Sequence, residues 1–339
     1  MPADATPPDD RIERLAEGVL AGERRALARA VTLVESANRA HRRDAAALLA
    51  RLAPHGGQAR RIGLSGTPGV GKSSFVETLG TRLTAAGHRV AVLAVDPSSA
   101  RSGGSILGDK TRMERLARDR AAFVRPSPAG RELGGVARRT REAIAVVEAA
   151  GFDTVIVETV GVGQSEAVVA QMTDVFALLL APGGGDELQG VKRGIMEIAD
   201  LIVVNKADGA LRRQAEATRA DYQGALALMR RRPGDAEGYP KALTASAATG
   251  EGVDAVWEAI APLADWRAAE GWRDERRARQ AHDWFRAALE RGLLERLHAD
   301  EGARAELEAA EAEVAAGALP PDAAAEALLD RLSLRFAAG

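Results

Sequence analysis

The 339-residue chain contains no cysteine. This absence excludes disulfides, cysteine-ligated zinc, iron–sulfur clusters and thiol nucleophiles from its chemistry. A chain without thiols fits a reducing compartment, and we expect a cytoplasmic protein. Aromatic residues are also few, at 4% of the chain against 46% for hydrophobic residues as a whole. We therefore expect a core made mainly of Ala, Leu and Val side chains.

The chain also lacks a strong net charge and any long hydrophobic run. Its 46 Lys and Arg residues nearly balance 48 Asp and Glu residues, which gives a formal net charge of −2. Dedicated nucleic-acid-binding proteins are usually basic, so we expect no nucleic-acid partner. The longest apolar run, Val175 to Pro182, is far shorter than the ~20 residues that span a bilayer. Because the first residues lack the apolar segment of a signal peptide, we expect no membrane association.

Changes in composition and in the spacing of apolar residues along the chain predict four regions. Residues 1–9 are acidic and Pro-rich, which predicts a disordered tail, and residues 10–57 carry apolar positions at helical spacing, which predicts a helical extension. Residues 58–266 alternate short aliphatic runs with amphipathic segments of helix length. This pattern is typical of an α/β fold with a mostly parallel sheet between helices. Residues 267–339 predict a helical arm, which either caps the sheet of its own chain or dimerises.

A glycine-rich motif follows the first predicted strand. The segment GTPGVGKS matches G-x-x-x-x-G-K-[ST], the pattern of a phosphate-binding loop (P-loop), with a strand before it and a helix after it. Glycines let successive backbone N–H groups converge on one phosphate, and the helix N-terminus adds partial positive charge. We expect Lys72 to reach the β- and γ-phosphates and Ser73 to ligate Mg²⁺. The predicted phosphate-binding residues are Gly66, Thr67, Pro68, Gly69, Val70, Gly71, Lys72, Ser73 and Ser74.

Two segments at later strand ends predict recognition of guanine. The tetrapeptide NKAD provides Asn205, Lys206 and Asp208 directly after a buried strand. A carboxylate at Asp208 can accept hydrogen bonds from guanine N1–H and the exocyclic amine, whereas adenine offers no such pair of donors. The last predicted strand leads into SAATG, where a backbone N–H of Ser246, Ala247 or Ala248 can meet guanine O6. We therefore predict that the chain binds GTP and GDP rather than ATP.

Carboxylates at the same sheet edge are candidate Mg²⁺ ligands. Asp96 and Glu158 each follow or end a predicted strand, and Asp109 follows a Gly- and Ser-rich loop. Mg²⁺ prefers hard oxygen ligands, so these three join Ser73 as the predicted metal site. Helix N-capping is the alternative role for such residues.

The segment around Glu158 also predicts the rate of hydrolysis. It reads E-x-x-G where GTPases usually have D-x-x-G, and Gly161 can give its N–H to the γ-phosphate. Val162 occupies the place where a water-positioning glutamine often stands, and Gln164 follows two residues later. Lys72, Glu158, Gly161 and Gln164 are the predicted catalytic group. Slow intrinsic GTP hydrolysis is expected, because no residue in the usual place orients the attacking water.

The order of these motifs resembles a known family. The blocks GTPGVGKSS, VDPSSARSGGSILGDKTRM, RELGGVARRT, VETVGVGQSE, APGGGDELQGVKRGIMEIAD, NKAD and SAATG together are similar to the methylmalonyl-CoA mutase-associated GTPases of the MeaB/ArgK type. These belong to the metallochaperone-like P-loop GTPases. The blocks at residues 95–113 and 181–200 are far more specific than a P-loop alone.

The resemblance implies a chaperone that uses GTP and Mg²⁺. Its client would be an adenosylcobalamin-dependent acyl-CoA mutase, methylmalonyl-CoA mutase above all, whose cofactor loading it gates and which it protects or reactivates. The resemblance also implies a homodimer formed through the C-terminal arm. In the family, residues 183–192 correspond to a loop that signals the nucleotide state to the mutase, with Asp186, Gln189 and Lys192 as the positions to compare.

Two other functions remain open at this point. A P-loop kinase would transfer phosphate to a small acceptor or a protein, although a kinase has no need to recognise guanine. A metal-insertion GTPase would need a metal site, but cysteine is absent and the five histidines form no ligand spacing. The chain also lacks the D-x-H-x-x-G cobalamin motif, so we do not expect it to hold cobalamin itself.

Overall fold

A computed structural model describes residues 8–36, 38–95, 113–126, 133–159, 165–183 and 193–337. The chain divides into two compact units, Met1–Arg277 and Ala278–Gly339. The first unit holds the sheet and every predicted nucleotide-binding segment. The second unit is entirely helical in its described part.

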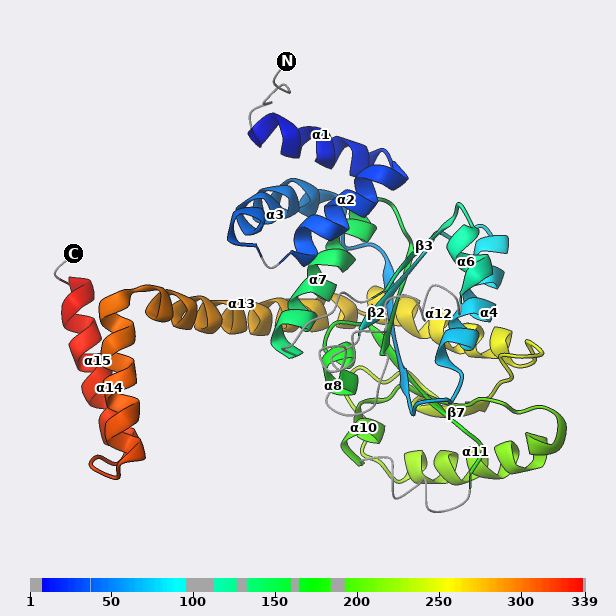
Figure 1. Cartoon of the computed structure of the whole chain (residues 1–339). Coiled ribbons are helices and arrows are strands. Elements are labelled where there is room, and N and C mark those ends of the chain that lie inside the picture. Colours follow the sequence, from blue (N-terminus) through cyan, green and yellow to red (C-terminus); the bar gives the residue numbers. More distant parts are fainter. Residues whose placement is uncertain are drawn as a thin grey trace. The chain divides into compact units, whose positions relative to one another are not determined.

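Seven strands form one sheet in the first unit. Their order is β3-β2-β4-β1-β5-β6-β7, and every pairing among the described strands is parallel. The central strands are buried along their length because helices cover both faces of the sheet (Figure 1), which confirms the predicted α/β fold. The strands are β1 Arg60–Gly66, β2 Val90–Val95, β3 Ala122–Arg125, β4 Thr154–Thr159, β5 Val175–Leu180, β6 Leu201–Val204 and β7 Lys241–Thr244.

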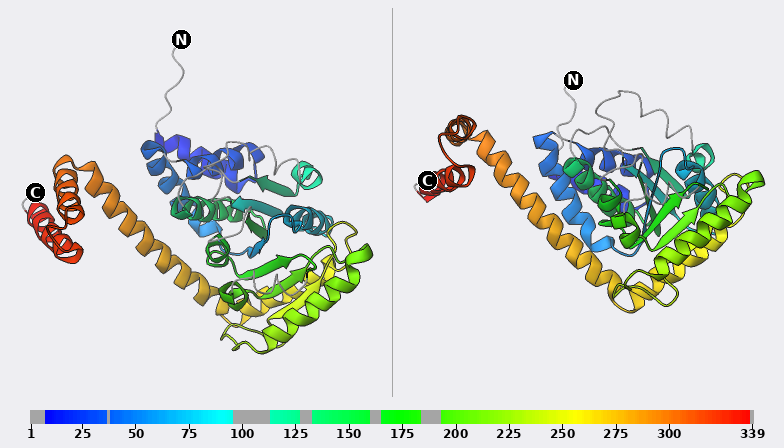
Figure 2. Two further views of the ribbon diagram at one scale, coloured as in Figure 1. Left: turned by 60° about the horizontal axis from the view of Figure 1, so that its bottom comes forward. Right: turned by 90° about the horizontal axis from the view of Figure 1, so that it is seen from below.

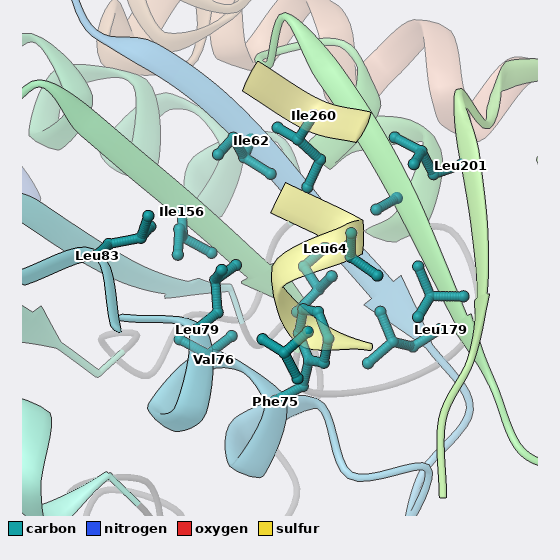
Figure 3. Close-up of a cluster of buried hydrophobic side chains, with 14 of the residues drawn as sticks. Ile62, Leu64, Phe75, Val76, Leu79, Leu83, Ile156, Leu179, Leu201 and Ile260 are labelled. Carbon is teal, nitrogen blue, oxygen red and sulfur yellow. The ribbon is translucent and has the colours of Figure 1, made fainter. Parts of the chain in front are cut away.

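The main hydrophobic cluster lies between one face of the sheet and two helices, α4 (Lys72–Ala85) and α12 (Val253–Ala269). Figure 3 shows side chains from β1, β4, β5, α4 and α12 directed toward one another, among them Ile62, Leu64, Phe75, Leu79, Ile156, Leu179 and Ile260. Gly63 alternates with Ile62 and Leu64 and therefore faces the other side of the sheet. A Cβ there would lie 2.9 Å from a methyl group of Val169, so the glycine allows α8 (Ser165–Ala170) to approach closely.

Other helices complete both layers of the first unit. Helix α7 packs on β2 and β4 beside α8, and α11 packs on β6 and β7. The remaining elements are α6 Glu114–Arg118, α7 Leu133–Ala149, α10 Arg193–Ile198, α11 Arg212–Ala227, and the 3₁₀ turns Ala53–His55 and Gly209–Leu211.

Three helices precede the sheet in the described part of the chain. They are α1 (Pro8–Leu20), α2 (Arg24–Glu35) and α3 (Arg39–Leu52), and α2 packs on α7. The predicted disordered tail, residues 1–9, is wrong at its end because α1 begins at Pro8. Proline fits the first turn of a helix, where its missing N–H would have no intrahelical partner. Residues 1–7 lie outside the described ranges.

An aspartate precedes each of three strands and joins it to a neighbouring strand. The carboxylate of Asp153 accepts from Arg89 N at 2.8 Å, that of Asp174 from Arg61 N at 2.9 Å, and that of Asp200 from Phe176 N at 2.8 Å. Each bond satisfies a backbone donor where the neighbouring strand begins. The same device therefore recurs at the amino ends of β4, β5 and β6.

Arginines neutralise two of these aspartates. Arg267 donates to both oxygens of Asp200 at 2.9 and 2.7 Å, and Arg277 donates to both oxygens of Asp174 at 2.8 and 2.6 Å. Arg232 donates to Asp200 as well, at 2.6 Å. Burial opposes the charged form of Asp200, but the hydrogen bond and charge of Arg267 and the charge of Arg232 outweigh it. They hold the pKa of Asp200 below its ordinary value.

These contacts correct the predicted domain boundary. The predicted arm starts at residue 267, inside the continuous helix α12, whereas the first compact unit extends to Arg277. Arg267 contacts Asp200, and Arg277 contacts Asp174. Arg276 donates to the carbonyls of Thr173 and Ala170 at 2.9 and 2.7 Å. The first residues of α13 (Trp272–Ala299) therefore belong with the sheet.

The second unit consists of the rest of α13, α14 (Glu301–Ala315) and α15 (Pro321–Ala337). Helices α14 and α15 lie side by side in both views of Figure 2, with Ala303, Ala310 and Leu328 buried in their common cluster. Helix α15 contains 17 residues. Within the described ranges, no helix has the combination of length and apolar composition that a membrane span requires.

Candidate functional site

The P-loop connects the end of β1 to the start of α4. Gly66 has φ 154° and approaches β5 so closely that a Cβ would lie 2.2 Å from the carbonyl oxygen of Leu179. Gly71 has φ 94°, and a Cβ there would lie 2.8 Å from Nδ2 of Asn205. Both positions therefore require glycine, one for close strand approach and the other for contact with the predicted base-binding segment.

Lys72 begins α4 and lies over its own loop. Its ammonium donates to the carbonyl oxygens of Gly66 at 2.6 Å and Thr67 at 3.2 Å, and the residue is 7% exposed. Pro68 and Gly69 are exposed, whereas the side chain of Val70 is buried in the core. The loop thus presents its backbone, with one buried cation beside it, which is the arrangement that binds phosphate.

Glu158 joins the P-loop at the carboxyl end of β4. It pairs in register with Leu64 of β1 and is 3% exposed, and its Oε1 accepts from the Ser73 hydroxyl at 3.0 Å. The structure therefore brings together a hydroxyl and a carboxylate that the sequence predicted as Mg²⁺ ligands. Hard oxygen donors of this kind fit Mg²⁺.

Seven of the predicted site residues fall outside the described ranges. The placement of the other metal candidates, the γ-phosphate contact and the partner loop thus stays a prediction. These residues are Asp96, Asp109, Gly161, Gln164, Asp186, Gln189 and Lys192.

Asn205 links the phosphate end of the site to the base end. Its Nδ2 donates to the Val70 carbonyl at 2.9 Å, and its Oδ1 accepts from Ala247 N at 3.0 Å. The residue is 1% exposed, so both bonds are shielded from water. NKAD, SAATG and the P-loop, which are far apart in the sequence, therefore meet at one side chain.

Asp208 and the segment Ser246–Gly250 form the base end. The Ser246 hydroxyl donates to Oδ1 of Asp208 at 2.7 Å, which orients the carboxylate, and Asp208 is half-exposed. Lys206 is exposed and has φ 61°, a rare left-handed conformation for a residue other than glycine. Such strain is typical of functional loops.

The backbone donors of Ser246–Gly250 can be assigned individually. The N–H groups of Ser246 and Gly250 bond to backbone carbonyls, that of Ala247 bonds to Asn205, and that of Thr249 bonds to the Ser246 hydroxyl. Among the described residues, nothing accepts from the N–H of Ala248, which is exposed. Ala248 is therefore the best-placed donor of the predicted trio for guanine O6.

Sequence reasoning missed Glu77 of α4. Its carboxylate accepts from Arg115 N at 2.9 Å and Leu116 N at 3.2 Å, and so it caps the first turn of α6. Gly80 lets α4 and α6 pack together, since a Cβ there would lie 2.5 Å from a methyl group of Leu116. A glutamate inside a helix has no motif that reveals such a distant partner.

Comparisons with known proteins give the relatives of this chain. The family described as methylmalonyl-CoA mutase-associated GTPase MeaB matches residues 27–302. A putative GTPase of Caulobacter vibrioides is 51% identical over 323 residues, which cover 95% of this chain and 98% of that protein. GTPase ArgK of Escherichia coli is 49% identical over 280 residues, which cover 83% and 84% of the two chains.

Two further comparisons widen the range of relatives. The mitochondrial methylmalonic aciduria type A homolog of Mus musculus is 45% identical over 334 residues, which cover 96% of this chain and 80% of that protein. A crystal structure described as LAO/AO transport system kinase is 37% identical, with a TM-score of 0.75, and the match covers 95% of this chain and 97% of that one.

Proposed function

This chain belongs to the family of methylmalonyl-CoA mutase-associated GTPases and hydrolyses GTP as a member of it; from that premise we propose that it is a cytoplasmic chaperone of an adenosylcobalamin-dependent acyl-CoA mutase. In this proposal it gates loading of the mutase cofactor and protects or reactivates the mutase, with methylmalonyl-CoA mutase as the first candidate client. The family match over residues 27–302 is the observation that carries this role.

We propose that GTP and GDP bind along the carboxyl edge of the sheet. The backbone of Gly66–Ser74 and the ammonium of Lys72 hold the phosphates, while Asp208 accepts from the guanine edge. The contact of Asn205 with both Val70 and Ala247 supports a single continuous site. Since Ser246 orients the Asp208 carboxylate, adenine would leave that acceptor without its two donors.

Ser73 and Glu158 are the described residues that would hold Mg²⁺, joined by Asp96 or Asp109. Bound Mg²⁺ would neutralise charge on the β- and γ-phosphates. Lys72 would provide a second positive charge to the same phosphates. Glu158 keeps the Ser73 hydroxyl oriented toward this edge of the sheet through their 3.0 Å bond.

Intrinsic hydrolysis is expected to be slow. Val162 stands where a glutamine often orients the attacking water, so Gln164 or a residue of the partner would have to supply that function. Single-turnover cleavage of GTP by the purified chain, with and without the mutase, measures this directly. A rate for the chain alone that equals that of an activated GTPase would refute the expectation.

The mutase role is tested by recovering native partners. The tagged full chain is incubated in cell extract with GDP or with a non-hydrolysable GTP analogue, and bound proteins are identified by mass spectrometry. We expect a cobalamin-dependent mutase whose recovery depends on the nucleotide. Substitution of Asp186, Gln189 and Lys192 should remove this dependence while leaving nucleotide affinity unchanged. If no mutase is recovered with either nucleotide, the chaperone role is wrong.

We also propose a homodimer formed through the second unit. Phe285, Leu289 and Leu293 recur every four residues on α13 and are 66%, 51% and 57% exposed, so they form one apolar stripe on the described chain. A second copy of the chain would bury this stripe. Sedimentation equilibrium should give a dimer for the native chain and a monomer for Leu289→Glu; a native monomer would contradict the proposal.

A kinase is the second candidate, because a relative of known structure that is 37% identical is described as one. Incubation with GTP labelled at the γ-phosphate separates the two functions. A GTPase releases the label as inorganic phosphate, whereas a kinase transfers it to an acceptor. The base-binding arrangement around Asp208 supports the first outcome.

A further inference from the structure

The three threonines of α4 differ in where their hydroxyls donate. Thr81 donates to the carbonyls of Glu77 and Thr78 and so bonds within its own helix. Thr84 donates to the carbonyl of Thr81 and is also hydrogen-bonded to the side chain of Asp119. Bonding within the helix is the usual arrangement for threonine. Thr78 instead donates across to the carbonyl oxygen of Ala247 at 2.9 Å, in a segment 169 residues later.

This bond fixes a particular peptide group. The carbonyl of Ala247 and the N–H of Ala248 belong to the same planar trans peptide and point in opposite directions. Holding the carbonyl against α4 therefore directs the N–H of Ala248 away from α4. That N–H is the donor in Ser246–Gly250 for which the described chain offers no acceptor.

The other side of Ala247 is held as well. Its N–H donates to Asn205, so the two peptide groups that flank this residue are anchored from different elements. One anchor comes from the segment after β6, and the other comes from the helix that begins with Lys72. Without Thr78, the 247–248 peptide could rotate while the bond to Asn205 persisted.

We propose that Thr78 is a positioning residue for the base: it fixes the Ala248 N–H for a 6-oxopurine nucleotide and so sets discrimination at position 6 of the ring. The proposal rests on the proposed nucleotide site. Thr78 contacts no nucleotide itself and acts through the peptide it holds. Because Lys72 and Thr78 lie on one helix, about 9 Å apart along its axis, α4 sets the distance between the phosphate and position-6 contacts.

The test uses two analogues of GDP, each of which differs from guanine at one edge of the base. In 6-thio-GDP, sulfur replaces O6 while N1–H and the exocyclic amine remain. Inosine diphosphate keeps O6 and loses the amine that Asp208 would accept from. Affinities for these two and for GDP are measured by calorimetry on the full chain with Mg²⁺. The native chain should prefer GDP over both analogues.

Thr78→Val removes the hydroxyl and keeps the shape of the side chain. We expect the preference for GDP over 6-thio-GDP to fall about three- to tenfold, the range of one hydrogen bond, while the preference over inosine diphosphate stays unchanged. Thr78→Ser should restore the native ratio. Thr81→Val is the matched control, because it removes a neighbouring half-buried hydroxyl that bonds only within α4. Thr78→Ala provides a second variant without the hydroxyl, should the valine variant not fold.

Three results would overturn the inference. The first is that the preference of Thr78→Val for GDP over 6-thio-GDP stays within twofold of the native preference. An equal loss in Thr78→Val and Thr81→Val is the second, since it would indicate a general effect on α4. If the native chain prefers GDP over neither analogue, the proposed base site falls together with the inference. If it prefers GDP and Thr78→Val does so equally, only the inference falls.

Discussion

The carboxylates at the two ends of the parallel strands have partners of opposite kinds. At the amino ends, Asp174 and Asp200 accept from backbone N–H groups and are also neutralised by Arg277 and Arg267. At the carboxyl ends, Glu158 accepts from the Ser73 hydroxyl and Asp208 from the Ser246 hydroxyl. Cations therefore neutralise the first pair within the chain, whereas hydroxyls orient the second pair, at the edge where we propose that the nucleotide binds. With the proposed nucleotide site, stability and binding would depend on opposite edges of one sheet.

The strongest way to break the comparison is to remove a carboxylate from the amino edge. Asp200→Asn should lower the free energy of unfolding by about 3–5 kcal/mol, because it removes the carboxylate that accepts two hydrogen bonds from Arg267 and leaves this buried guanidinium only the more distant carboxylate of Asp235, at 3.7 Å. Denaturant unfolding measures the loss. Asp254→Asn is the control: Asp254 also pairs with an arginine, Arg82, but is 70% exposed, so its loss should be below about 1 kcal/mol. Equal losses in the two variants would contradict the assignment.

A cation at the opposite edge should affect binding without affecting stability. Lys72→Ala should weaken GTP binding about a hundredfold or more, since several charged hydrogen bonds to phosphate are lost. Without nucleotide, its unfolding transition should stay close to that of the native chain. Nucleotide titration and circular dichroism of the same samples measure the two properties. A large loss of stability with native affinity would reverse the roles of the two edges.

At the base end of the proposed site, nucleotide selectivity can be separated from stability. Asp208→Asn should reduce the preference for GTP over ATP about tenfold or more, because an amide cannot accept from guanine as a carboxylate does. The stability of the free protein should change little, since Asp208 is half-exposed. Competition binding with both nucleotides measures the ratio, and Asp221→Asn, at an exposed position of α11, serves as control. Unchanged discrimination against ATP would refute the role of Asp208.

The smallest expected effect is the change in unfolding free energy with acid pH. The pKa of Asp200 lies below its ordinary value in the folded chain, so its contribution to stability is present above the unfolded pKa and is lost as the pH falls through the folded pKa. The difference in unfolding free energy between the native chain and Asp200→Asn should therefore shrink below about pH 4, by up to about 1.4 kcal/mol per pH unit.

Measuring the difference between the native chain and Asp200→Asn also cancels a contribution to the pH dependence of stability that opposes that of Asp200. Burial raises the pKa of Glu35, so its contribution has the opposite sign and is lost as the pH rises. Glu35 is present in both proteins and cancels in their difference. A difference that stays constant down to pH 2 would mean that Arg267 and Arg232 do not stabilise the charged form of Asp200.

Features that a short stretch of chain determines by itself, such as buried strands and the P-loop, could be predicted from the sequence. The apolar run Val90–Val95 matches strand β2 residue for residue, and the run Val175 to Pro182 contains strand β5, because a strand buried on both faces must be apolar throughout. The P-loop was equally predictable, since its glycines, lysine and serine act within one turn of chain. Its closeness to NKAD and SAATG followed from the rule that ligands bind at the carboxyl ends of parallel strands.

Contacts between distant side chains were beyond prediction. Glu77, Thr78 and Arg267 each bond to a partner 38 or more residues away, and no local pattern distinguishes them from other polar helix residues. The domain boundary was misplaced for the same reason, since Arg276 and Arg277 look like solvent-facing residues of an arm. In a chain with 46 Lys and Arg residues, only the structure identifies which few are buried.

The position of β1 in the sheet has a consequence for synthesis on the ribosome. This strand carries the P-loop, yet its neighbours β4 and β5 are translated about 90 and about 110 residues after it. Until Thr159 has left the exit tunnel, both edges of β1 lack a partner, and until Leu180 has left it, the edge that pairs with β5 stays open and Gly66 lacks the strand it packs against. Nascent chains halted before that point should therefore be unable to bind guanine nucleotides, and their exposed strand edges should make them clients of the cell's folding chaperones.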